Sequence, residues 1–257
     1  MRVFMNDLGH RAARRQRGVR VYLSLVLLAI LAVLSTAIVV PKAASADTGP
    51  VLYVFINSAE KPRTLQKKLE TGMPGVVVTV FGRFRDFESA IEAARPDAVL
   101  ALQPVLTELG MKPTLQGTYK SSPDEAYALV AVGKSVDAAA AAQLTIGSVD
   151  ILGRSMMKNF VGKVLGTTTA PKVKLVTKTE DLLPLLQFGQ ADVVLLPERQ
   201  TALLTGRSEL DLKVSILPNR VHLVAAAAVT PKGQSVLSLV KNLDTSVSAD
   251  MGVDSWR

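Results

Sequence analysis

Three consecutive residues in the middle of the chain combine features of an anion-binding site. Gly153, Arg154 and Ser155 follow a predicted strand over 144–148 and open a predicted helix. The first amide N–H groups of a helix attract anions, glycine lets a ligand approach closely, and arginine can hold a carboxylate or phosphate through two hydrogen bonds. These residues therefore predict an anion site. The same pattern also fits a helix that Asp150 and Ser155 merely cap, with Arg154 in solvent.

Polar side chains also follow other predicted strands. In open α/β sheets, ligands bind beyond the carboxyl ends of the strands, so these positions are candidates for contact with a solute. The alternatives are ordinary turn chemistry for Asn57 and Ser58, and solvent exposure in a helical first turn for Glu198 and Arg199. The residues that complete the predicted ligand site are Asn57, Ser58, Gln103, Glu198 and Arg199.

Residues suited to catalysis are scarce. The chain has no Cys and two His, of which His10 lies near the N-terminus and His222 stands alone on a predicted buried strand. The motifs of zinc proteases, serine hydrolases and phosphate-binding loops do not occur after residue 46. We therefore expect no catalytic residue, no metal and no cofactor, and an exported α/β enzyme is the weakest alternative.

The elements that position these residues alternate between apolar, β-branched segments and amphipathic segments. This alternation predicts mostly parallel sheets flanked by helices. The predicted strands are 51–56, 76–81, 97–102, 127–132, 144–148, 173–176, 192–196, 212–216 and 221–229, and the predicted helices are 60–71, 86–94, 153–164, 180–188 and 233–243.

Two of these units resemble each other. In each, a helix leads to an aspartate, Asp97 or Asp192, which opens an apolar strand with a proline just after it. The repetition favours an α/β fold with two lobes of similar construction. The strands 127–132 and 221–229 lie between or after the two units, and we expect them to cross from one lobe to the other.

The first 46 residues resemble a secretory leader. Six arginines precede residue 21, an uncharged apolar run covers 21–40, and Ala44-Ser45-Ala46 provides small residues for a signal peptidase. We expect cleavage after Ala46 and release into the periplasm. The alternative is an uncleaved inner-membrane anchor, because twenty apolar residues are enough to span a bilayer.

The formal net charge of +8 belongs mostly to this leader. Residues 1–46 hold seven of the 30 basic groups and one of the 22 acidic groups, which leaves a net charge of +2 on the remainder. No run of basic residues mixed with aromatic residues remains after residue 46. We therefore expect no nucleic-acid partner, and contact with a membrane only through an uncleaved N-terminal segment.

A leader followed by two α/β lobes resembles the periplasmic substrate-binding proteins of the Venus-flytrap (type 2) fold. Three stretches carry the likeness: AYALVAVGK at 126–134, LTIGSVDILGRS at 144–155, and the helix–strand unit at 180–199. The phosphonate and phosphate binders of ABC transporters are the most similar subgroup. The 211 residues after the leader are few for this family, and the turn at 153–155 lacks the Ser/Thr-rich sequence usual in the subgroup.

This resemblance implies a domain organisation and partners. Residues 47–125 would form one lobe, 126–229 the hinge strands and second lobe, and 230–257 a C-terminal helix and tail returning to the first lobe. A small, anionic solute would bind between the lobes and pass to the membrane subunits of an ABC transporter. The alternative function is a membrane-anchored sensory or assembly protein with the same fold.

Overall fold

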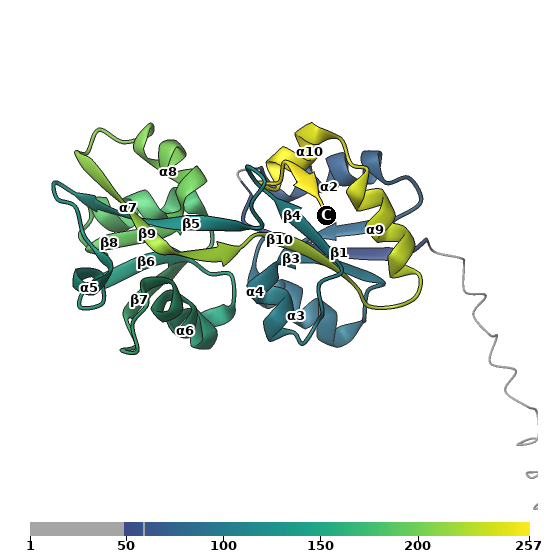
Figure 1. Cartoon of the computed structure of the whole chain (residues 1–257), viewed down its shortest axis with the longest axis horizontal. Coiled ribbons are helices and arrows are strands. Elements are labelled where there is room, and N and C mark those ends of the chain that lie inside the picture. Colours follow the sequence, from purple (N-terminus) through teal and green to yellow (C-terminus); the bar gives the residue numbers. More distant parts are fainter. Residues whose placement is uncertain (1–48, 59) are drawn as a thin grey trace, which may run out of the picture. The chain divides into compact units, whose positions relative to one another are not determined.

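The computed structural model describes residues 49–58 and 60–257, and residues 48–257 form one compact unit. The predictions for the leader, its cleavage after Ala46 and a span over 21–40 lie outside the described residues. The described part contains two sheets flanked by helices (Figure 1), which confirms the predicted two-lobed α/β fold. Within this part of the chain, no helix is long and apolar enough to cross a membrane.

Lobe 1, formed by residues 49–118 and 224–257, contains a six-stranded sheet in the order β11-β4-β10-β3-β1-β2. β1 pairs in parallel with β2 and β3, whereas β10 pairs antiparallel with both β3 and β4. The strands are β1 (Val51–Phe55), β2 (Val77–Val80), β3 (Ala98–Leu102), β4 (Leu115–Thr118), β10 (Val224–Ala228) and β11 (Ser255–Trp256).

Lobe 2, formed by residues 124–222, contains a five-stranded sheet in the order β7-β6-β8-β5-β9. β6 pairs in parallel with β7 and β8, and β5 pairs antiparallel with β8 and β9. The strands are β5 (Asp124–Val132), β6 (Thr145–Val149), β7 (Lys172–Val176), β8 (Val193–Pro197) and β9 (Leu212–His222).

Helices follow the strands in both lobes. The five residues of β3 and the five of β8 are all buried, as expected for parallel strands covered on both faces. Lobe 1 has α2 (Pro62–Gly72), α3 (Phe84–Ala93), α4 (Gln103–Glu108), α9 (Gly233–Lys241) and α10 (Thr245–Asp250). Lobe 2 has α5 (Ala138–Ala141), α6 (Gly153–Leu165), the 3-10 helix η1 (Thr179–Asp181), α7 (Leu182–Gln187) and α8 (Glu198–Thr205).

The sheets are mixed, which refines the prediction of mostly parallel sheets. The parallel part of each sheet has three strands, and the crossing strands continue it in the antiparallel direction. Two short helices begin directly after a buried strand and have no side-chain cap: α4, which the sequence analysis missed, and α8, of which it considered only a first turn. α4 has a proline near its start, which is a signal for a helix, but its six residues are too few to show a helical period.

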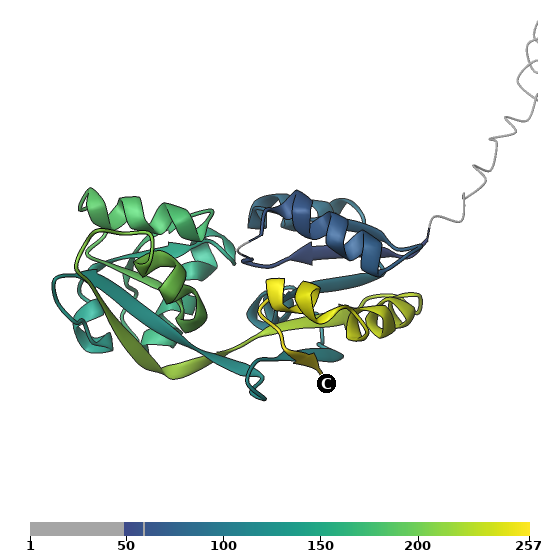
Figure 2. The same cartoon turned by 90° about the horizontal axis from the view of Figure 1, so that it is seen from above.

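The chain crosses between the lobes twice, and the two crossings lie side by side (Figure 2). The first leads from β4 to β5 through a tight turn in which Lys120 and Ser121 have positive φ angles. The second passes from β9 to β10 through Leu223 alone, so the predicted strand 221–229 is divided between the two sheets. Asp124 at the start of β5 pairs with His222 at the end of β9, which places the crossings in one ladder.

The two aspartates that repeat in the sequence have the same structural task. Asp97 accepts a hydrogen bond from the backbone N–H of Val51 at 2.9 Å, and Asp192 accepts one from that of Thr145 at 2.8 Å. Val51 and Thr145 are the first residues of β1 and β6. Each carboxylate therefore joins the beginnings of two neighbouring parallel strands, and the likeness between the two segments extends to their hydrogen bonds.

Candidate ligand-binding cleft

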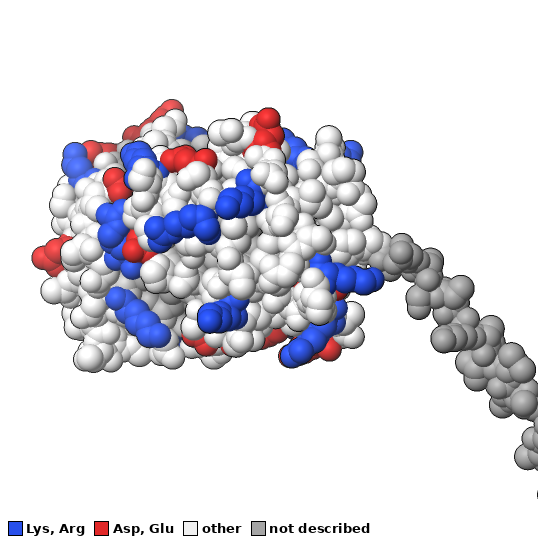
Figure 3. All heavy atoms as spheres, turned by 45° about the vertical axis from the view of Figure 1, so that its right-hand side comes forward, with Lys and Arg blue, Asp and Glu red and all other residues white. Residues whose placement is uncertain are grey.

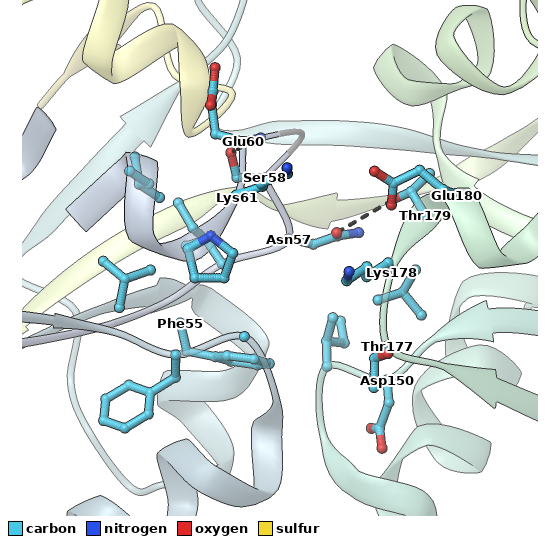
Figure 4. Close-up of a pocket in the computed structure, with 18 residues that line it drawn as sticks. Phe55, Asn57, Ser58, Glu60, Lys61, Asp150, Thr177, Lys178, Thr179 and Glu180 are labelled. Carbon is cyan, nitrogen blue, oxygen red and sulfur yellow. Dashed lines mark hydrogen bonds between the residues drawn. The ribbon is translucent and has the colours of Figure 1, made fainter. Parts of the chain in front are cut away.

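A cavity of about 140 Å³ lies between the lobes, at the carboxyl ends of β1, β2, β6 and β7 (Figure 4). Lobe 1 supplies a mostly apolar wall that includes Phe55, Val80 and Phe81. Lobe 2 supplies the polar segment 177–180 together with 149–151. The cavity therefore lies where open α/β sheets usually hold their ligands, and its two walls differ in chemistry.

Asn57, one of the predicted ligand residues, connects the two lobes. Its amide nitrogen donates to Gln200 Oε1 at 3.4 Å, and its amide oxygen accepts from the Thr179 hydroxyl at 3.4 Å. Its backbone oxygen also accepts from Gln200 Nε2 at 3.2 Å. Figure 4 shows the side chain reaching from lobe 1 to Thr179 across the cavity. Asn57 thus has its polar groups occupied by lobe 2, so it acts first as an interlobe contact.

Gln200 and Thr179 are contributors that the sequence analysis missed. Both are buried, with 6% and 8% exposure, and the Thr179 hydroxyl donates to Gln200 Oε1 at 2.9 Å. Gln200 lies one residue beyond the predicted Arg199, in the first turn of α8. A buried glutamine requires hydrogen-bond partners, but the burial of Gln200 is visible only in the structure, so the sequence offered no signal for this residue.

The charged side chains of the cavity wall divide into paired and unpaired groups. Glu60 forms a salt bridge with Lys68 at 3.3 Å. The side chains of Lys61, Lys178 and Glu180 have no hydrogen bond or ion pair with any described residue, and all three are exposed. Figure 4 places the Lys178 ammonium group in the gap near Asn57. The wall therefore offers two free cations and one free carboxylate to a solute.

The helix start at Gly153 is already partly occupied by a carboxylate. Asp150 Oδ1 accepts from the N–H groups of Gly153 at 2.7 Å and Leu152 at 3.3 Å. Gly153 has a φ of +78°, and a Cβ there would meet the ring of Phe84 in lobe 1 at 3.3 Å. This arrangement matches the capping alternative for Asp150. It leaves the amide N–H groups of Leu152 and Gly153 unavailable to an external anion.

The remaining predicted residues lie at different distances from the cavity. Arg154 and Ser155 are exposed, their side chains form no hydrogen bond with a described residue, and they are not part of the cavity wall. Ser58 lies on the wall, but its hydroxyl donates to Asp250 O at 2.7 Å. Glu198 is exposed outside the wall, and Gln103 lines another cavity next to α4.

Arg199 belongs to a buried ion pair below the cleft. Its Nε lies 2.8 Å from Glu125 Oε2, with side-chain exposures of 17% and 6%. Burial raises the pKa of Glu125, and the charge of Arg199 acts against this rise. The guanidinium lies so close to Gly252 of lobe 1 that a Cβ there would meet its Cζ at 2.4 Å. Arg199 thus joins β5 to α8 and packs against the C-terminal segment of lobe 1.

Comparison with known proteins identifies the fold. No protein-family model and no curated protein sequence matches the chain. Holo ArgBP from T. maritima is 12% identical with a TM-score of 0.53, covering 76% of this chain and 88% of that chain. An arginine-bound amino acid ABC transporter substrate-binding protein from Streptococcus pneumoniae is 12% identical with a TM-score of 0.52, covering 81% and 95%.

A third match is the BvgS VFT2 domain of Bordetella pertussis, 13% identical with a TM-score of 0.52, covering 80% of this chain and 93% of that domain. At such low identity these likenesses concern the fold alone. The chain has the two-lobed, Venus-flytrap fold that these substrate-binding proteins share.

Proposed function

We propose that the chain is an exported solute-binding protein that holds a small solute between its lobes and delivers it to the membrane subunits of an ABC transporter. The observation that carries this proposal is the cavity between the carboxyl ends of parallel strands from both lobes. The two-lobed fold of the matched substrate-binding proteins supports a binding role rather than a catalytic one.

The proposed ligand is a small solute with an anionic group and an apolar body. Lys178 of lobe 2 and Lys61 of lobe 1 are the cations available to the anionic group, and Phe81 of lobe 1 offers an apolar surface to the body of the solute. The free carboxylate of Glu180 favours a solute that also carries an ammonium group, such as an amino acid, over the phosphate or phosphonate suggested by the sequence. The cavity volume of about 140 Å³ lies below the range of about 300 to 1,000 Å³ that is usual for small-molecule sites, so we expect a small solute.

Ligand identity can be tested by thermal unfolding of the full chain with L-amino acids, phosphate, phosphonates and simple carboxylates. A ligand present at about 100 times its Kd stabilises the folded state by about 2.7 kcal/mol, which gives a measurable rise in Tm. We expect a zwitterionic amino acid to raise the Tm most. If no compound of any class raises it, the proposed binding role is wrong.

A pair of lysine variants tests the location of the site. Lys178→Gln removes a free cation from the cavity wall, whereas Lys174→Gln removes an exposed cation on β7 outside that wall. We expect the first variant to weaken binding of the active compound by about tenfold, the loss of one charge-assisted hydrogen bond, and the second to leave it unchanged. Equal affinities for the two variants would move the site away from the cavity.

Export is a separate part of the proposal. We propose cleavage after Ala46 and release into the periplasm, and the competing arrangement is retention by residues 21–40 as a sensory or assembly protein. Cell fractionation followed by intact-mass measurement distinguishes the two. A soluble periplasmic form that begins at Asp47 supports release, whereas a membrane-bound form that retains residues 1–46 supports the anchored alternative.

A further inference from the structure

A second and larger cavity, of about 410 Å³, lies beside the crossing strands. Its walls come from α4 of lobe 1, α6 of lobe 2 and the end of β9, and it shares no residue with the cleft cavity. We call it the hinge groove. Its volume falls within the range of about 300 to 1,000 Å³ that is usual for small-molecule sites.

The floor of the hinge groove is apolar and well supported. Met156, Phe160 and Val164 recur at every fourth residue of α6 and therefore lie on one face of that helix. Phe160 and Val164 are 7% and 3% exposed, and the Phe160 ring packs edge to face on Tyr127 with centroids 5.8 Å apart. A floor held in this way offers a preformed surface to an apolar group.

The rim of the hinge groove carries more positive than negative charge. Lys163 and Glu108 are exposed, and their side chains have no partner within the described residues. Arg220 donates through Nη2 to the backbone oxygen of Asp124 at 3.0 Å, and the neighbouring His222 is paired with the Asp124 carboxylate. Lys163 is thus a free cation at the edge of an apolar floor, with Arg220 as a second cation.

Unfavourable carbonyl groups are covered at the same end of the groove. The last carbonyl groups of a helix carry partial negative charge and would repel an anion. The Asn219 side chain donates to the backbone oxygens of Lys163 and Val164 at 3.2 and 3.1 Å. The side chains of Gln103 and Asn159 have no partner in the described structure and add free amide groups to the walls.

We propose that the hinge groove is a second ligand site, which binds a small amphipathic carboxylate with its apolar body on Phe160 and its carboxylate at Lys163. This site is independent of the solute proposed for the cleft. α4 and α6, which both line the groove, belong to different lobes.

Fluorine NMR on the full chain tests the proposal without knowledge of the natural ligand. The anionic probe is trifluoromethyl-phenylacetate, and its cationic counterpart is trifluoromethyl-benzylamine. If the preparation requires lipid nanodiscs, empty nanodiscs provide the blank. We expect line broadening of the carboxylate by the protein, saturating with concentration, and weaker broadening of the amine because Lys163 and Arg220 repel it.

Three exposed positions provide matched variants. Asn159→Trp fills the groove and should abolish binding of the probe. Lys163→Gln should weaken it about fivefold, the effect of losing one exposed ion pair. Lys158→Gln, an exposed charge change on α6 outside the groove wall, should leave it unchanged.

Lys178→Gln in the cleft separates this proposal from the proposed function, because it should reduce solute binding and leave probe binding intact. The hinge-groove proposal is overturned if the carboxylate does not bind, if the amine binds equally well, or if Asn159→Trp binds the probe as the unmodified chain does. It is also overturned if Lys178→Gln is the variant that loses the probe.

Discussion

Lobe 1 and lobe 2 each place a group of three parallel strands beside an antiparallel crossing strand, yet they present different walls to the cavity between them. Lobe 1 contributes Phe55 and Phe81, which belong to an aromatic cluster with Phe87. Lobe 2 contributes the polar segment 177–180. Similar frameworks therefore carry different loops, so the framework explains the position of the cavity and the loops determine its chemistry.

Figure 3 shows lysine and arginine side chains spread over one face of the molecule rather than gathered in one patch. The lobes differ in how deeply their ion pairs are buried. Lobe 2 contains the buried pair of Glu125 and Arg199, whereas the salt bridges of Lys68 in lobe 1 are partly exposed. The aspartates at the strand starts differ as well. Asp97 accepts an additional hydrogen bond from the Thr230 hydroxyl, whereas Asp192 is exposed. The following substitutions test whether these differences in burial and bonding determine stability.

The largest loss of stability is expected from breaking the buried ion pair of Arg199 and Glu125. Arg199→Ala leaves the Glu125 carboxylate without its partner and should lower the free energy of unfolding by about 3 kcal/mol in urea titrations. Lys68→Ala is the control in lobe 1 and should change stability little, since solvent screens that pair. Combining Arg199→Met with Glu125→Gln should restore part of the loss. A loss equal to that of Arg199→Ala would show that the charge of Glu125 is not the cause.

The two strand-start aspartates form the next comparison. Asp97→Ala removes the acceptor for the Val51 N–H and the Thr230 hydroxyl, and should cost about 2 kcal/mol in the same titration. Asp192→Ala removes one exposed hydrogen bond and should cost less than half as much. Equal losses would mean that the shared contact to the neighbouring strand outweighs the difference in surroundings.

Two glycines in the left-handed region separate backbone strain from interlobe crowding. Gly75 in lobe 1 has a φ of +84° and open space where a Cβ would lie, whereas Gly153 has a φ of +78° and faces the Phe84 ring at 3.3 Å. Alanine should cost about 1 kcal/mol at Gly75 from the backbone alone. At Gly153 it should cost more, and the cost of Gly153→Ala measured in a Phe84→Leu background should approach the Gly75→Ala value. Thermal unfolding measures all three.

The smallest effect expected is a difference in pH dependence. Hydrogen bonds from Thr230 and Val51 lower the pKa of Asp97, so its contribution is complete above the unfolded pKa of about 3.9 and is lost as pH falls through the folded value. Burial raises the pKa of Glu125 in the folded protein above its unfolded value of about 4.3. Between these two pKa values the folded state binds the proton more tightly than the unfolded state, so stability rises as pH falls through this range.

The two substitutions should therefore change the stability curve in opposite directions. Asp97→Asn should reduce the loss of stability at the acid end, and Glu125→Gln should remove a gain at less acidic pH. Urea titrations at intervals across the acid range measure both slopes. If both variants change the slope in the same direction, one of the two assignments is wrong.

The sequence predicted the framework well because its signals are local. A few consecutive residues are enough to predict an apolar strand such as 97–102 or to recognise the repeated aspartates. The residues that line the cleft are harder to predict from the sequence. Lys178 and Thr179 follow β7, a strand whose end was recognised but whose loop carries no motif. Lys61 lies at a helix start without a capping residue.

The partners of the predicted site residues were out of reach for a different reason. Asn57, one of the predicted ligand residues, lines the cavity, but Gln200, to which it bonds, lies far away in the sequence. Arg199 is paired with Glu125. Glu125 precedes the parallel strands of lobe 2 in the sequence and Arg199 follows them, so the sequence does not show whether Arg199 is free or paired. Such pairings depend on how the chain is folded in three dimensions, which a single sequence does not specify.

The position of β10 has a consequence for the order in which the chain becomes structured during synthesis. β10 lies between β3 and β4 in the sheet of lobe 1, yet it leaves the ribosome after the whole of lobe 2. Lobe 2 is contiguous in sequence and has all its strands as soon as β9 emerges. Lobe 1 cannot join β3 to β4 until its missing central strand arrives, so we expect the lobe made first to be completed last.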